Sequence, residues 1–153
     1  MLFEDVNDKY SVTEIIDDFD SGLALFVLDR KVPAASASPI CLPKFDKRDI
    51  NTEDDPCFFA GYEKNGVFKQ IDVPVIDSSN CMVPADIVDE IICIGANLCA
   101  ISDPGAYLTC VGDDRRLVLR GISAPSKTLF NCQVVSTHVK IASNLGFIAE
   151  NVV

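Results

Sequence analysis

Short runs in which apolar residues stand together or alternate with polar ones recur along most of the chain. The runs are rich in Val, Ile and Phe, and Gly, Pro, Asn and Asp separate them, which is typical of an all-β barrel or sandwich. The predicted strands are GLALFVLDR (22–30), PCFFAGYE (56–63), VFKQIDVPVID (67–77), DEIICIG (89–95), AYLTCVG (106–112), RLVLRGISA (116–124) and VVSTHV (134–139). The pattern therefore predicts an all-β fold.

Two segments depart from this pattern. Residues 31–56, KVPAASASPICLPKFDKRDINTEDDP, have few strand signals and hold four of the eight prolines, so we interpret them as a connector. The six strand candidates after it fit one closed six-stranded barrel. At the end of the chain, apolar residues recur at the spacing of one helical face, which predicts a short amphipathic helix. These residues are Ile141, Leu145, Ile148 and Val152.

Size, hydrophobicity and charge narrow the possible functions. The 153 residues suit one domain with a real core, and no apolar run is as long as a membrane span, so membrane insertion is not expected. A hydrophobic content of 48% is high for a soluble chain, and it indicates that part of the apolar surface packs against something else. The formal net charge of −10 would repel a phosphate backbone, so nucleic acid is not an expected partner.

Acidic residues cluster in TEIIDDFD (13–20) and DKRDINTEDDP (46–56). We interpret both runs as solvated faces and loops. A calcium site built from Asp17, Asp18 and Asp20 is the alternative, but their spacing lacks the alternating ligands of a known calcium loop. We therefore predict no metal and no cofactor.

The seven cysteines are dense for a cytosolic protein and ordinary for an extracellular one, so the sequence predicts a secreted protein. The start, MLFEDVNDKY, has no apolar run typical of a secretory signal, and a signal is expected upstream or on a precursor. No C-x-x-C pair occurs and His138 is the only histidine, which argues against structural zinc. Six cysteines can pair internally in many ways, and one is left free or bonded to another chain.

Several segments, in their order along the chain, resemble the trypsin-like (chymotrypsin-fold) serine protease family. GLALFVLDRKVPAASASPICLP looks like the family's DIALLKL…PVCLP, CFFAGY like CxVxGWG, and FKQIDVPVIDSSNC like LQxVxVPVVSxxxC. DEIICIGANLCAISDPGAYLTC is similar to xxMICAGxxxxCxGDSGGPLVC, LVLRGISAPS to WxLVGIVSWG, and VVSTHVKIASNLGFI to GVYTRVSxYxxWI. The resemblance covers nearly all of the chain.

This resemblance implies a trypsin-like double β-barrel of which only the end of the first barrel is present. Residues 1–45 would form that end and the crossover, and residues 46–153 would form the complete second six-stranded barrel and the short C-terminal helix. Family pairing implies three disulfides: Cys57–Cys110, Cys81–Cys93 and Cys99–Cys132. Cys41, in SPICLP, matches the cysteine that bonds to a light chain or propeptide in two-chain members, so an N-terminal partner chain is expected there.

The same alignment implies that the catalytic machinery is missing. Pro104 falls on the nucleophilic serine, and proline has neither a hydroxyl nor a backbone N–H. Gly22 falls on the catalytic aspartate, although Asp20 lies two residues away, and the segment that carries the catalytic histidine is absent. Ser102 stands where the first glycine of the oxyanion hole should be. Hydrolysis by the family mechanism is therefore not expected.

The resemblance also implies a degraded specificity pocket. Asn97 occupies the pocket floor where a trypsin has aspartate, and the bulky Leu98 follows it. Three residues replace the Ser-Trp-Gly edge that pairs with the substrate backbone: Ala124, Pro125 and Ser126. His138 falls where the family has arginine, next to the C-terminal helix, and we expect it to have a structural role.

These observations lead to one functional hypothesis and two alternatives. The hypothesis is a secreted, non-catalytic serine protease homologue that acts by protein–protein interaction, as one chain of a disulfide-linked two-chain protein. The first alternative is a structural subunit of an extracellular assembly, in which another chain supplies the missing half-barrel. The second is a serine peptidase whose active site is completed by another chain.

Overall fold

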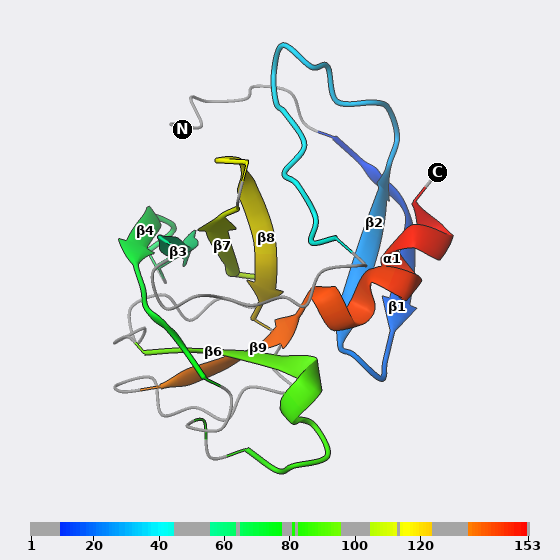
Figure 1. The fold of residues 1–153 in the computed structure, drawn as a ribbon. Coiled ribbons are helices and arrows are strands. Elements are labelled where there is room, and N and C mark those ends of the chain that lie inside the picture. Colours follow the sequence, from blue (N-terminus) through cyan, green and yellow to red (C-terminus); the bar gives the residue numbers. More distant parts are fainter. Residues whose placement is uncertain are drawn as a thin grey trace.

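The computed structural model describes residues 10–44, 56–63, 65–77, 81, 83–95, 105–112, 114–123 and 135–152. Two antiparallel sheets and one short helix dominate this part of the chain (Figure 1). One sheet is a hairpin of β1 (Val12–Asp18) and β2 (Leu23–Leu28). The other has the strand order β4-β3-β7-β8-β9-β6-β5. Its strands are β3 (Cys57–Tyr62), β4 (Phe68–Asp72), β5 (Val75–Ile76), β6 (Ile91–Ile94), β7 (Tyr107–Val111), β8 (Leu117–Ile122) and β9 (Ser136–Lys140).

The larger sheet curls on itself and closes through a bent strand. β4 and β5 are two parts of the predicted run 67–77, and because β4 pairs with β3 and β5 with β6, this run joins the two edges of the sheet. At the bend, the Val73 N–H donates to the Cys57 carbonyl (3.0 Å) and the Gly95 N–H donates to the Pro74 carbonyl (3.0 Å). Proline suits this irregular position because it has no N–H to contribute to a ladder. The all-β prediction is confirmed, and the six runs after the connector build this closed sheet.

Side chains from facing strands fill the interior of the barrel. Phe59 of β3 and Leu108 of β7 are fully buried there. The sequence of β6 is continuously apolar because both faces of the strand are covered. Ile92 and Ile94 belong to the interior cluster, while Ile91 and Cys93 pack with Cys81 in a second cluster. A strand that is covered on both faces has no polar face, so its sequence does not alternate.

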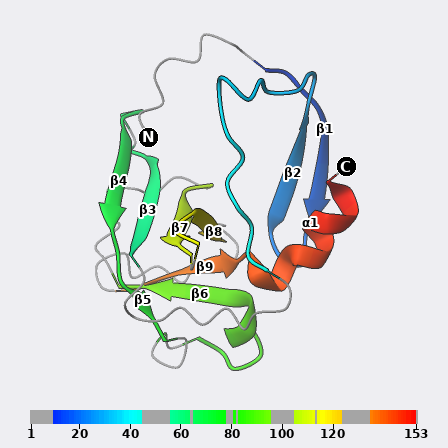
Figure 2. The same ribbon diagram turned by 45° about the horizontal axis from the view of Figure 1, so that its top comes forward.

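The C-terminal helix packs between the barrel and the hairpin. α1 (Leu145–Asn151) follows the short 3₁₀ turn η3 (Ala142–Asn144), and it lies beside β1 and β2 in both views (Figures 1 and 2). Val152 lies just past its end and is exposed, so the predicted helix is present but shorter than its apolar spacing indicated. The buried cluster that holds these parts together consists of Leu23, Val139, Ile141, Leu145 and Ile148.

The hairpin contains a strand that our interpretation of the acidic run missed. Most of the run TEIIDDFD forms β1, which pairs antiparallel with β2 and has an irregularity between Val12 and Glu14. The β-branched residues Thr13, Ile15 and Ile16 favour an extended backbone, and the acidic side chains are tolerated because this strand is largely exposed. The acidic run is therefore solvated, as expected, but it is a strand and not a loop.

The connector has no regular strand in its described part, residues 31–44, although one of its residues, Cys41, forms an isolated bridge with β8. Residues 45–55 lie outside the described part, so the division of the chain at residue 45 stays a prediction. The described helices are all too short or too polar to cross a lipid bilayer.

Candidate functional site

Two disulfides hold the barrel strands that would frame the catalytic turn. Cys57 on β3 and Cys110 on β7 lie directly opposite each other, with their Cα atoms 4.0 Å apart, and both are buried in the interior cluster. Cys93 on β6 is bonded to Cys81 in the outer cluster. These are two of the three pairs that the family resemblance implies. The third implied pair, Cys99–Cys132, lies outside the described residues.

The turn that carries the degenerate nucleophile position enters the described part of the chain at Gly105. This glycine has a φ of +89°, a conformation that L side chains rarely adopt. Its N–H donates to the Ser123 carbonyl (2.9 Å), and the Ser123 N–H donates to the Ala106 carbonyl (2.8 Å). The chain that leaves the turn is therefore fixed to the end of β8 before it becomes β7.

The residues at the centre of the implied active site lie outside the described part of the structure. These are the degenerate positions Ser102 and Pro104 and the degenerate pocket positions Asn97, Leu98, Ala124, Pro125 and Ser126. Their roles stay predictions. What the structure does describe is the frame beside them: Gly105, β7, and the end of β8.

The position that matches the catalytic aspartate lies in the tight turn of the hairpin. Gly22 is exposed with a φ of +77°, and its N–H donates to the Asp18 carbonyl (2.8 Å). Asp20 is exposed in the same turn, where its N–H donates to Asp18 Oδ1 (3.2 Å). A glycine in this conformation is favoured by the turn itself, and it brings no carboxylate toward the barrel.

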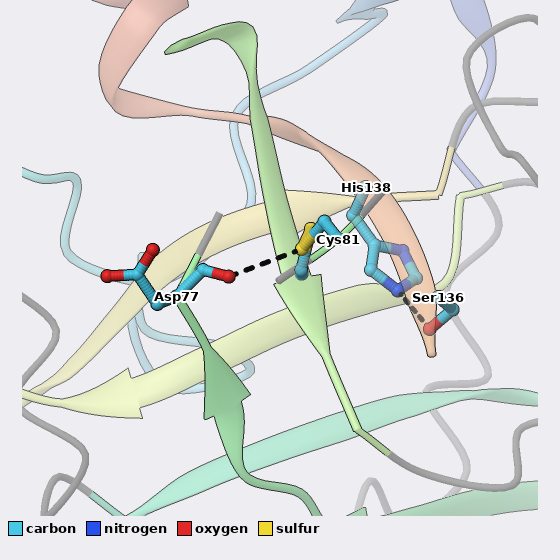
Figure 3. The surroundings of a disulfide bond; sticks show 5 residues. Asp77, Cys81, Ser136 and His138 are labelled. Atoms are coloured by element: carbon cyan, nitrogen blue, oxygen red, sulfur yellow. Dashed lines mark hydrogen bonds between the residues drawn. A yellow bond between two sulfur atoms is a disulfide. The ribbon is translucent and has the colours of Figure 1, made fainter. Parts of the chain in front are cut away.

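His138 is buried in the barrel, and serine hydroxyls occupy both of its ring nitrogens. Ser123 Oγ lies 2.9 Å from Nδ1. Ser136 Oγ lies 2.9 Å from Nε2, as Figure 3 shows. The ring also stacks at a tilt on Phe59, with 4.9 Å between the ring centroids. Its side chain is only 2% exposed, and burial lowers its pKa from 6.5 to about 4. The imidazole is therefore neutral at pH 7 and closed off from solvent, which agrees with a structural role.

Sequence reasoning did not find the two serines. Ser136 could have been found, because residues two apart on a strand share a face and Ser136 and His138 have that spacing on β9. Ser123 could not have been found this way, because it follows β8 and reaches His138 only through the pairing of β8 with β9.

Cys41 is the one free cysteine in the part of the chain that the structure describes, and it is half-buried. Its N–H donates to the Leu117 carbonyl (3.3 Å), and its carbonyl accepts from the Leu119 N–H (2.9 Å), so the connector is fixed along β8. The apolar side chains beside it, Ile40, Leu42 and Leu117, are exposed. The Cys41 thiol thus lies in a partly apolar patch of the surface, on a backbone that is hydrogen-bonded to β8.

Within the described residues, no group of three or more histidine, cysteine, aspartate or glutamate side chains is arranged to hold a metal ion. The carboxylates of the alternative calcium site lie in or next to the hairpin turn. Asp17 and Asp20 are exposed, and the Asp18 carboxylate accepts the Asp20 N–H in the turn.

Comparison with known proteins gives a partial answer about the family. No protein-family model matches the chain. The chain is similar to coagulation factor XII from Bos taurus, at 26% identity over an alignment of 137 residues that covers 78% of this chain and 22% of factor XII. The similarity is to a trypsin-like serine protease. The chain spans about a fifth of the length of this relative, and its curled β-sheet with a short C-terminal helix is consistent with the end of a trypsin-like barrel.

Proposed function

We propose that this chain is a secreted, non-catalytic serine protease homologue that acts through protein–protein contacts. The observation that carries the proposal is the proline at the nucleophile position: Pro104 supplies neither the attacking oxygen nor one of the backbone donors of the oxyanion hole. Loss of one such donor lowers the rate by roughly 10²–10³, and loss of the nucleophile lowers it by roughly 10⁶. The two losses do not multiply, because each disables the same step.

The other catalytic groups have no replacement among the described residues. Gly22 has no side chain, and Asp20 is in an exposed turn of the hairpin, whereas His138 is buried in the barrel with both ring nitrogens hydrogen-bonded. A general base must be accessible to the proton that it takes. His138 therefore cannot act as one without disruption of the barrel. Secretion is supported by the two disulfides and by the similarity to a coagulation factor.

We further propose that a second chain is disulfide-linked through Cys41. This cysteine is free and half-buried while four other described cysteines are paired, and exposed apolar side chains flank it. A partner that covers Ile40, Leu42 and Leu117 would both protect the bond and bury apolar surface.

The first prediction concerns catalysis. The full chain, incubated with a fluorophosphonate probe and with casein, is expected to show no labelled serine and no cleavage, while trypsin in a parallel reaction is labelled and cleaves casein. Intact mass and gel fluorescence measure the labelling. A stoichiometric adduct on a serine of this chain would contradict the proposal, and an adduct that forms only when a second chain is bound would support the peptidase completed by another chain.

The second prediction concerns Cys41. Native secreted material, compared by intact mass before and after reduction, is expected to lose the mass of one linked chain. In material expressed with its partner, Cys41→Ser should abolish this link and leave Cys57–Cys110 and Cys81–Cys93 intact, as peptide mapping can check. If reduction releases no chain and the Cys41 thiol is freely alkylated in native material, the partner is not held through this cysteine.

The structural-subunit alternative is favoured by one specific observation, which is the exposed apolar surface of the β1–β2 hairpin. Native mass spectrometry separates it from a binary complex. A repeating stoichiometry of several copies supports an assembly, whereas one copy with one linked chain supports the primary proposal.

A further inference from the structure

The turn between β3 and β4 carries an asparagine that is followed by a glycine. Asn65 is the only asparagine of the sequence with this neighbour. The turn is short, because Tyr62 and Phe68 form the last antiparallel pair of the two strands. In both views these strands lie on the far side of the barrel from the β1–β2 hairpin (Figures 1 and 2). Asn65 and Gly66 are both exposed, so water and hydroxide reach the dipeptide.

Gly66 leaves its own backbone nitrogen unshielded. Its φ is +79°, a conformation that favours glycine, and a Cβ placed on it would have no heavy atom within 4 Å. No side chain of residue 66 therefore stands between this nitrogen and the Asn65 side chain. The other two asparagines in the described part of the chain, Asn144 and Asn151, precede leucine and valine, whose side chains crowd the nitrogen that follows.

Hydrogen bonds fold the Asn65 side chain back along the turn. Asn65 Oδ1 accepts from the Val67 N–H (3.0 Å), and Asn65 Nδ2 donates to the Glu63 carboxylate (3.2 Å). The bond to Val67 keeps the side-chain carbonyl close to the peptide between Asn65 and Gly66. Such proximity makes an attack by the Gly66 nitrogen an intramolecular step. The Gly66 N–H donates to the Glu63 carbonyl (2.8 Å), so a base must take this proton before the nitrogen can attack.

We propose that Asn65 is a site of spontaneous deamidation, in which the backbone nitrogen of Gly66 attacks the Asn65 side chain. A bond forms between the Gly66 nitrogen and Asn65 Cγ, the Cγ–Nδ2 bond breaks, and Nδ2 leaves as ammonia with the proton that the Gly66 nitrogen gives up. Water then opens the cyclic succinimide at either of its two carbonyl carbons, which yields aspartate or isoaspartate. The reaction needs neither a catalytic residue nor a partner chain, so it is independent of the proposed function.

The modification changes the charge and the length of the turn. Glu63 accepts from Lys69 Nζ (2.6 Å) as well as from Asn65, and these two hydrogen bonds lower the pKa of the Glu63 carboxyl. Either product replaces the Asn65 donor with a negative charge, so the pKa of Glu63 should rise. Isoaspartate also adds one carbon to the backbone of the turn that closes on the pair of Tyr62 and Phe68.

Peptide mapping of the aged protein tests the proposal. The full chain is held at mildly alkaline pH and physiological temperature, sampled over several weeks, and digested in heavy-oxygen water, which marks any product formed during digestion. Fragmentation in the mass spectrometer distinguishes aspartate from isoaspartate. Both products are expected at Asn65, without the heavy-oxygen label. Conversion at Asn65 should exceed conversion at Asn144 and Asn151, the internal controls, by about tenfold or more.

Two variants separate attack by Gly66 from direct hydrolysis of the amide. Gly66→Ala places a methyl group beside the attacking nitrogen and should slow conversion at Asn65 by about tenfold. Asn65→Gln keeps the amide but lengthens the side chain by one carbon, and it should leave residue 65 unconverted. Circular dichroism confirms that each variant is folded. Asn65→Asp supplies the standard for one product, and nuclear magnetic resonance of this variant measures the expected rise in the pKa of Glu63.

Three results would overturn the proposal. Conversion at Asn65 that only equals conversion at Asn144 and Asn151 would show that the turn does not promote the reaction. Aspartate without any isoaspartate would show that water attacks the amide directly and no succinimide forms. An unchanged rate in folded Gly66→Ala would show that the glycine nitrogen is not the attacking group.

Discussion

Replacement of Cys57 and Cys110 together by alanine is expected to lower the free energy of unfolding by about 4 kcal/mol. The bond joins residues 53 apart in sequence, and restriction of the unfolded chain by a loop of that length accounts for an effect of about this size. The pair also contributes to the interior cluster, in which Cys110 on β7 is fully buried opposite Cys57 on β3. Removal of this disulfide is therefore expected to loosen the packing between β3 and β7 and also to raise the conformational entropy of the unfolded chain.

The matched control is the second disulfide. Its cysteines are 12 apart in sequence and belong to the outer cluster, so Cys81→Ala with Cys93→Ala should cost about 3 kcal/mol. Urea unfolding of the three proteins, followed by circular dichroism, measures both values. If removal of the short-range bond costs as much as removal of the long-range bond, loop length and interior position do not govern the contribution of Cys57–Cys110.

The barrel could be predicted because its strands have strong local signals. Cys57–Tyr62 and Leu117–Ile122, for example, are apolar runs between turn residues, and each forms a strand close to its predicted place. β1 was missed because we interpreted its acidic residues as a sign of a solvated loop. In an exposed strand, acidic side chains can stand among the β-branched residues that favour the extended backbone. The helix was predicted too long because Val152 keeps the apolar spacing although it is exposed. Spacing alone cannot distinguish a buried apolar residue from an exposed one.

The candidate site was predictable only through the family resemblance. That resemblance supplied two cysteine pairs that the structure brings together, whereas the sequence alone left many pairings open. The surroundings of His138 depend on which strands lie next to each other, and no local pattern contains that information. The contact between Ser123 and His138 joins residues 15 apart across two paired strands, so it emerges only when the barrel is formed.

The stability of the protein is expected to fall as the pH decreases from 6.5 to 4, by about 3 kcal/mol from His138 alone. Burial lowers the pKa of the folded histidine to about 4, while the unfolded one titrates near 6.5. Between these values the unfolded state binds a proton that the folded state does not, so acid favours unfolding in this window. Above pH 6.5 both states are neutral and the contribution does not change. Each unit of difference corresponds to about 1.4 kcal/mol.

The serine partners do not remove this penalty. A serine hydroxyl can donate or accept, so both hydrogen bonds can be kept when the ring is protonated, and the cost is that of a charge buried beside Phe59 and the apolar core. His138→Phe should be less stable at pH 7.5, because Ser123 and Ser136 lose a partner, but its stability should change about 3 kcal/mol less across the window. Carboxylates titrate in both proteins and largely cancel in the difference. Urea unfolding of both proteins at several pH values measures this difference in the free energy of unfolding. Parallel pH profiles for the two proteins would show that the buried imidazole does not set the acid sensitivity of the barrel.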